Sequence, residues 1–321
     1  MEIKMRRLKL RDAGGAAAVN KNGLRRKDNV QAVFMILPQV IGLMLFSIYP
    51  IVYVVKYSFF DYNMVTARFC GLNNFVRIFT NDPAYWKSIV NILLIGGSKL
   101  VVEIPLAFIL AYIIDSKYIH AKGVFRTIYY MPSVMSSAVI GLIYYFLFSA
   151  SDGVVNSFLL HINAIAEPIP WFSEKWSALF VIAAASLWQG FGVNVLFFSS
   201  GMSTIPKDYY ESADIDGATA VQKLLHITVP SLGPIMQVIC MLAIINTLKM
   251  MDLVKVLTNG NPAGETEVLM LYLFKKFFAY GSGTEAEIGY AAALGVVTAI
   301  ILGMITVLYK KMTHRMEESN I

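Results

Sequence analysis

Long hydrophobic runs dominate the sequence, and six of them are long enough to cross a lipid bilayer. A bilayer span needs ~20 mostly uncharged residues, because a charge inside the hydrocarbon is costly. The runs cover residues 32–55, 89–114, 128–148, 178–202, 234–257 and 288–309. Charges interrupt the second run at Lys99 and Glu103, and the fifth run at Lys249, Asp252 and Lys255. The pattern predicts six transmembrane helices and therefore an all-α, polytopic membrane protein.

Composition supports a membrane protein and argues against a metal centre. The 321 residues are 57% apolar and 15% charged, with a mean hydropathy of +0.59, which leaves too few polar residues to cover a water-soluble globule. The first run is longer than the roughly 7–15 apolar residues of a signal sequence, so we expect a retained helix. The histidines are scattered without the i,i+4 spacing of a metal site, so no metal-binding or catalytic residues are predicted.

Basic residues predict the orientation of the chain. The segment before the first run, residues 1–31, is the most densely basic part of the sequence, and the positive-inside rule places it in the cytoplasm. Nucleic-acid binding is the alternative, but the segment directly precedes a span and lacks interleaved aromatic residues, so we expect no nucleic-acid partner. Six crossings return the chain to the same side. We expect a transmembrane domain at residues 32–312 and a cytoplasmic tail at 313–321.

The loop between the fourth and fifth runs, residues 205–230, has a specific construction. Pro206 suits the first turn of a helix, and Gly217 offers the left-handed conformation that ends one. An amphipathic segment follows, and Pro230 is expected to end it before the next span. The loop therefore predicts two short cytoplasmic helices joined at Gly217, which would form a docking element. An ordinary interhelical loop is the alternative.

The same loop carries a family resemblance. Its sequence Tyr210-Glu-Ser-Ala-Asp-Ile-Asp-Gly-Ala218, followed by Ile227-x-Val-Pro230, resembles the EAA motif of permeases from binding-protein-dependent ABC importers. The usual motif is Glu-Ala-Ala-x-x-x-Gly followed by Ile-x-Leu-Pro, so Ser212 and Val229 depart from it. Further segments resemble the carbohydrate-uptake branch, close to the maltose-type permeases: 71–75, 125–132 and 257–262. The resemblance extends nearly end to end from residue 32.

The resemblance implies a role, partners and a location. It implies a type I importer permease in a prokaryotic cytoplasmic membrane, alternating between inward-open and outward-open states. It also implies a second, related permease chain, two cytoplasmic ATPase subunits that bind ATP and Mg, and an extracytoplasmic solute-binding protein. This sequence has no Gly-x-x-x-x-Gly-Lys-Ser/Thr phosphate loop, so we expect a transport subunit that is not itself an enzyme and binds no cofactor. The ATPase-coupling residues implied are Glu211, Ser212, Ala213, Asp216, Gly217, Ala218, Ile227 and Pro230.

Polar residues within the runs are candidates for a sugar path, because sugars need amides or charges together with aromatic rings. The candidates are Trp188, Gln189, Asn194, Asn246, Thr247, Lys249 and Asp252, and the resemblance adds Met250. For each, bonding to a neighbouring helix is the alternative. We expect Lys99 and Glu103, four residues apart, to neutralise each other or to face the second permease. Lys249 and Asp252 could also pair, whereas an unpaired Lys249 in the cavity would favour an acidic sugar.

Rival functions remain open at this point. A secondary transporter driven by an ion gradient should show repeated halves, which the sequence lacks, although Asp252 and Glu103 could carry protons. A membrane enzyme acting on lipid-linked sugars should show clustered carboxylates, and only Asp214 and Asp216 lie close together. An ABC importer permease for a polyol or a glycerol phosphate ester is the third alternative.

Overall fold

The computed structural model describes residues 33–116, 119–279 and 285–318. The basic segment 1–31, expected to be cytoplasmic, lies outside these residues, and so does the end of the predicted tail. The chain divides into two compact units, Met1–Tyr57 and Ser58–Ile321. In the first unit the described chain is one helix, Val33–Tyr57, which includes the π-helical turn η1 (Met44–Ile48) and α2 (Tyr49–Tyr57).

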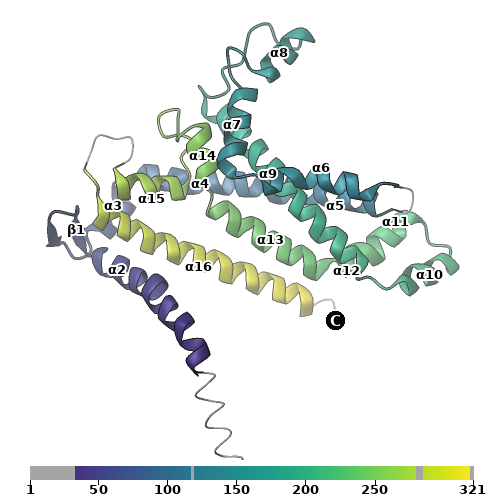
Figure 1. The fold of residues 1–321 in the computed structure, drawn as a ribbon, viewed down its shortest axis with the longest axis horizontal. Coiled ribbons are helices and arrows are strands. Elements are labelled where there is room, and N and C mark those ends of the chain that lie inside the picture. The colour runs from purple at the N-terminus through teal and green to yellow at the C-terminus, as the bar shows by residue number, and fades with distance from the viewer. Residues whose placement is uncertain (1–32, 117–118, 280–284, 319–321) are drawn as a thin grey trace, which may run out of the picture. The chain divides into compact units, whose positions relative to one another are not determined.

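The second unit is almost entirely helical (Figure 1). Its elements in chain order are β1 (Phe60–Tyr62), β2 (Ala67–Phe69), α3 (Asn73–Thr80), α4 (Pro83–Ser98), η2 (Lys99–Glu103), α5 (Ile104–Asp115), α6 (Lys122–Val134), α7 (Ser137–Leu147), α8 (Val154–His161), α9 (Lys175–Ser203), α10 (Lys207–Ile215), α11 (Ala220–Lys223), η3 (Leu224–Thr228), α12 (Val229–Ser231), α13 (Gly233–Leu248), α14 (Asp252–Leu257), α15 (Leu269–Phe278) and α16 (Ile288–Glu318). The strands form one antiparallel pair with Phe60 opposite Phe69, a small exception to the all-α expectation.

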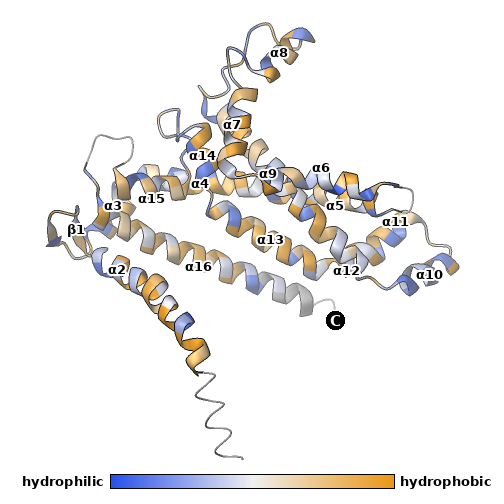
Figure 2. Ribbon diagram, viewed as in Figure 1, coloured by the Kyte–Doolittle hydropathy of each residue, from blue (hydrophilic) through white to orange (hydrophobic). Residues whose placement is uncertain are grey.

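The described helices supply the predicted spans. Four are long and apolar enough to cross a membrane: Val33–Tyr57, Pro83–Asp115, Lys175–Ser203 and Ile288–Lys311. Two bent pairs bring the number to six if each pair is one span: Lys122–Val134 with Ser137–Leu147, and Ala220–Ser231 with Gly233–Leu248. Figure 2 shows the long helices mainly in hydrophobic colours, whereas α10 is largely hydrophilic. The protein is thus a mostly helical, polytopic membrane protein, as predicted.

Two predicted spans are not the single helices that the sequence suggested. The third is bent by 97° between α6 and α7, where Met135 is extended and the side chain of Ser136 caps α7. The fifth ends at Leu248 instead of residue 257, and α14 is a separate helix that begins at Asp252. At the first of these breaks the side chain of Ser136 bonds the chain locally, which a continuous apolar run does not reveal.

Three π-helical turns share one feature of sequence. Each of η1, η2 and η3 is followed two residues later by a proline: Pro50, Pro105 and Pro230. A proline lacks the backbone N–H and its ring crowds the carbonyl four residues earlier, so a wider turn lets the helix continue past it. The helix therefore passes Pro230 and ends one residue beyond the predicted end. The helix continues to Ser231, and the 63° bend comes after it.

The helices of the second unit are held together at two ends, which we call the α10 end and the Asp82 end. At the α10 end, α5 and α9 finish, α6 begins, and the helices of the 205–230 loop lie against them (Figure 1). At the Asp82 end, the first turns of α4, α15 and α16 meet, because Asp82 accepts hydrogen bonds from Tyr272 and Tyr290. Ion pairs from Lys87 and Lys175 to Glu265 join α4 and α9 to the chain before α15, at 2.6 and 3.2 Å. These side-chain hydrogen bonds lower the pKa of the Glu265 carboxyl.

Candidate functional site

A polar cavity of about 360 Å³ lies between the second, third, fourth and fifth spans. Of the eight residues proposed for the sugar path, six line it: Gln189, Asn194, Asn246, Lys249, Met250 and Asp252. These residues come from α9, from the end of α13, from the break between α13 and α14, and from the first position of α14. The break that shortens the fifth span is therefore what brings Lys249 and Asp252 to the cavity.

The other two proposed residues do not line this cavity. Trp188 is 39% exposed, and its ring lies 5.8 Å from that of Tyr144. Thr247 is buried and donates a hydrogen bond to the carbonyl of Ala243 in its own helix, at 2.7 Å. Its methyl group also packs near Gly96. Trp188 thus contacts a neighbouring helix, whereas the hydroxyl of Thr247 bonds within its own helix.

Gln189 has a structural task as well as a place in the cavity wall. Its amide donates to the carbonyl of Met135, at 3.1 Å, and exchanges hydrogen bonds with Ser137. Ser133 in turn donates to the backbone carbonyl of Gln189, at 2.7 Å. The amide thus satisfies backbone and hydroxyl groups at the 97° bend of the third span, where the helical hydrogen bonds are interrupted.

Lys99 and Glu103 also line the cavity, which the sequence reasoning missed. Their charged groups lie 3.8 Å apart, so the pairing expected from the i,i+4 spacing is present. Asn194, from the fourth span, donates to Oε1 of Glu103 at 2.6 Å. No such pairing joins Lys249 to Asp252: both side chains are exposed, and the described residues give neither an ion-pair partner.

The 205–230 loop folds into two helices joined at Gly217, in the form the sequence suggested. Gly217 has φ +74°. The N–H of Ala218 bonds to the carbonyl of Ala213, at 2.9 Å, and that of Gly217 to the carbonyl of Asp214, at 3.2 Å. This pair of bonds is the Schellman arrangement that closes a helix on a left-handed residue. Pro206 stands at the N-cap of α10, one position earlier than expected.

Side chains then fix the two helices to each other. The side chain of Thr219 caps α11 and accepts from the backbone of Gln222. Lys223 pairs with Asp214 at 2.6 Å, and the hydroxyls of Tyr210 and Thr228 lie 2.9 Å apart. Of the eight proposed coupling residues, Glu211, Ser212, Asp216, Gly217 and Pro230 are exposed, whereas Ala213, Ala218 and Ile227 are half-buried. The loop is thus a fixed two-helix element with an accessible polar side.

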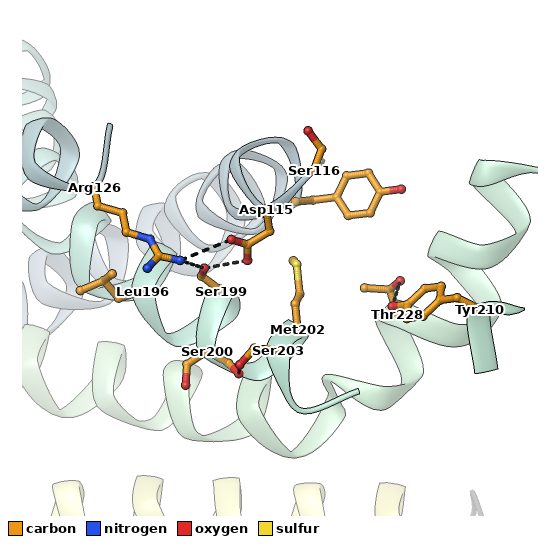
Figure 3. A pocket seen from close by; sticks show the side chains of 11 residues that line it. Asp115, Ser116, Arg126, Leu196, Ser199, Ser200, Met202, Ser203, Tyr210 and Thr228 are labelled. Atoms are coloured by element: carbon orange, nitrogen blue, oxygen red, sulfur yellow. Dashed lines mark hydrogen bonds and ion pairs between the residues drawn. The ribbon is translucent and has the colours of Figure 1, made fainter. Parts of the chain in front are cut away.

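A second cavity, of about 1070 Å³, lies where this loop meets the ends of the spans (Figure 3). On one side, Asp115 at the end of α5 accepts from the hydroxyl of Ser199 in α9, at 2.6 Å, and lies 3.6 Å from Arg126 of α6. The Tyr210 and Thr228 pair of the loop lines the opposite side. One polar cluster therefore links three spans next to the loop. The sequence reasoning had not singled out Asp115 or Ser199.

Known proteins share the sequence and fold of this chain. A probable ABC transporter permease protein, YesP of Bacillus subtilis (strain 168), is 32% identical over 302 residues, which cover 92% of this chain and 94% of the relative. The arabinooligosaccharides transport system permease protein AraP of the same organism is 30% identical, covering 86% of each chain. The lactose transport system permease protein LacF of Rhizobium radiobacter is 29% identical, covering 91% and 97%.

Two solved structures and a family model complete the comparison. A bacterial ABC transporter involved in the import of the acidic polysaccharide alginate contains a chain with a TM-score of 0.77 at 22% identity, covering 91% of this chain and 99% of that one. A bacterial alginate ABC transporter in complex with an alginate pentasaccharide-bound periplasmic protein gives the same score at 23% identity, covering 90% and 96%. The model of the binding-protein-dependent transport system inner membrane component matches residues 103–317. This chain belongs to that family and is the membrane-spanning permease of an ABC importer, not an enzyme.

Proposed function

We propose that this permease carries a sugar or a short oligosaccharide. The observation that carries the proposal is the cavity between the second, third, fourth and fifth spans. It gathers three amides, Gln189, Asn194 and Asn246, with the charged Lys249 and Asp252. Amides and charges are the groups that hydrogen-bond hydroxyls, and a hydrocarbon environment makes such groups costly unless they serve a purpose. The named cargoes of AraP and LacF, arabinooligosaccharides and lactose, support the same class.

The proposal includes a coupling role for the 205–230 loop. Its exposed polar residues, Glu211 among them, would bond to an ATPase subunit, and its exposed apolar side chains would be covered there. Tyr209, Ile215 and Val221 are 57%, 88% and 63% exposed, which a hydrophilic loop without a partner would not require. ATP and Mg would be held by two such ATPase subunits. The α10 end then faces the cytoplasm, together with both chain termini.

Rigid-body movement of the spans would link ATP binding to the cavity. ATP can shift the permease from inward-open to outward-open only by favouring one of the two states through the docked ATPase. The Asp82 end would then face a solute-binding protein, and a second permease chain would complete the path. The bacterial alginate ABC transporter in complex with an alginate pentasaccharide-bound periplasmic protein supports the proposed binding-protein partner.

Uptake by proteoliposomes tests the proposed energy source and cargo. We expect a complex of this chain with its second permease and its ATPase to take up lactose, arabinotriose or an alginate trisaccharide when loaded binding protein and ATP are supplied. Uptake should continue in the presence of a proton uncoupler and stop when the ATPase is left out. The reverse result would indicate the rival secondary transporter, in which Glu103 and Asp252 would carry protons. Uptake of a polyol or a glycerol phosphate ester alone would contradict the sugar cargo.

Lys249 provides a second test, of the charge of the cargo. Its ammonium group is exposed in the cavity, whereas Lys99 is paired. We expect Lys249→Gln to lower uptake of an anionic alginate trisaccharide by about tenfold or more, because a hydrogen bond to a charged group contributes ~1.5–3 kcal/mol. Uptake of neutral lactose should stay within about twofold. Initial rates for the two sugars measure the difference, and equal losses for both would contradict this role.

A further inference from the structure

One oxygen of the Glu103 carboxylate has unused hydrogen-bonding capacity. Oε1 accepts the 2.6 Å bond from Asn194, but Oε2 is buried and accepts no hydrogen bond from the residues that the structure describes. Lys99 lies 3.8 Å from Oε2, which is close enough for charge attraction and too far for a hydrogen bond. Glu103 as a whole is only 2% exposed. A buried carboxylate oxygen without a donor is unfavourable, so a donor from outside the chain would stabilise it.

The backbone of the fourth span holds this carboxylate in place. A Cβ atom added at Gly190 would lie 2.4 Å from Oε1 of Glu103, so the carboxylate fits against α9 only because that position lacks a side chain. Glu103 itself is the last residue of the π-helical turn η2, which begins at Lys99. The ion pair, the amide of Asn194 and the glycine together fix the orientation of the group.

Glu103, which carries this buried oxygen, is a residue of the wall of the transport cavity. Glu103 lines the same 360 Å³ space as Asn246 and Lys249. Gln189 of the fourth span already uses its side-chain amide at the bend of the third span. Among the described residues of this wall, Glu103 and Asp252 carry carboxylates, the strongest acceptors, and Oε2 of Glu103 is the acceptor that is buried without a donor. A sugar offers hydroxyl donors at close spacing, which suits a carboxylate.

We propose that Glu103 binds the transported sugar, with Oε2 accepting hydrogen bonds from its hydroxyl groups while Lys99, Asn194 and Gly190 hold the carboxylate in position. The inference rests on the proposed sugar cargo and adds Glu103 to it as a binding residue. The i,i+4 spacing of Glu103 from Lys99 had suggested a purely structural role. A pair that served only to neutralise two charges could be replaced by apolar side chains without loss of function.

Replacing both charges separates a sugar-binding role of Glu103 from a purely structural role of the Lys99–Glu103 pair. In the full complex in proteoliposomes, we expect the double variant Lys99→Leu, Glu103→Leu to raise the KM for uptake of lactose or arabinotriose by about tenfold or more, because the sugar loses a charged acceptor. A purely structural pair would leave the KM unchanged, and that result would overturn the proposal. Thr298→Val is the matched control, since it removes a buried hydrogen bond to Tyr85 of 3.1 Å at the Asp82 end. We expect the control to keep the wild-type KM.

A single methyl group provides a test that keeps both charges. Gly190→Ala displaces the carboxylate from α9, so we expect the KM to rise while Lys99 and Glu103 remain paired. This variant decides the question if the double variant does not assemble, and an unchanged KM in it would then overturn the proposal. Absence of uptake of either sugar by the wild-type complex would reject the sugar cargo together with the role of Glu103. Wild-type uptake with unchanged KM values in the variants rejects only the role of Glu103.

Discussion

Gly217→Val should abolish the ATP hydrolysis that loaded binding protein stimulates, while the chain still inserts into the membrane. Gly217 has φ +74°, and a β-branched residue in that conformation costs on the order of 1–3 kcal/mol. Valine would therefore break the two hydrogen bonds that end α10 and change the angle between the helices of the 205–230 loop. An ATPase seated on that loop would lose its fit.

Asparagine at the same position is the matched control. A Cβ added at Gly217 meets no heavy atom within 4 Å, so the space is open and only the backbone conformation restricts the choice of residue. Asparagine adopts the left-handed conformation far more readily than valine. We expect Gly217→Asn to retain most of the stimulated ATPase activity of the purified complex. A Gly217→Val complex that still hydrolysed ATP in response to loaded binding protein would refute the coupling role.

Asp82→Ala should destabilise the end of the molecule opposite the loop. Asp82 is 8% exposed, its carboxylate accepts from Tyr272 at 2.7 and 2.8 Å and from Tyr290, and it caps α4 through the N–H of Tyr85. Burial and the hydrogen bond to Asp82 raise the pKa of Tyr272, so its phenol remains a donor. With ~1.5–3 kcal/mol for each bond to a charged group, we expect a loss on the order of 3–5 kcal/mol.

The thermal unfolding of the purified protein in detergent measures this loss. We expect a lower melting temperature for Asp82→Ala and an intermediate value for Asp82→Asn, which keeps an acceptor and a capping group but removes the charge. Thr298→Val, which removes one neutral hydrogen bond nearby, should have a smaller effect than either. A melting temperature of Asp82→Ala equal to that of Thr298→Val would contradict this account.

The sequence predicted the approximate positions of the four to six candidate spans, because hydrocarbon selects strongly for uncharged runs. It did not predict where the spans bend. The third span breaks where Met135 becomes extended and Ser136 caps α7, and such hydrogen bonds leave no trace in hydropathy. The contacts of Asp82 with Tyr272 and Tyr290 were also beyond reach, since they join residues 190 and 208 positions apart.

The sequence also predicted part of the candidate site, because hydrocarbon selects against polar residues within spans. Polar residues are rare within spans, so Asn194, Asn246 and Lys249 stood out, and the structure places them at one cavity. Trp188 and Thr247 stood out equally and lie elsewhere, because polarity alone does not specify which side of a helix a residue occupies. Lys99 and Glu103 were set aside because their spacing already accounted for both charges.

The π-helical turn η2 also changes how the second span must be read. An α-helix turns about 100° per residue, and a π turn takes up one residue more for a similar rise. The side chains of α5 are therefore offset by roughly that angle from the directions that the periodicity of α4 would give. A helical wheel drawn without interruption through Pro83–Asp115 would therefore assign the α5 part of the span to the wrong neighbours. The lipid-facing and protein-facing sides of α4 and α5 are out of phase across Lys99–Glu103.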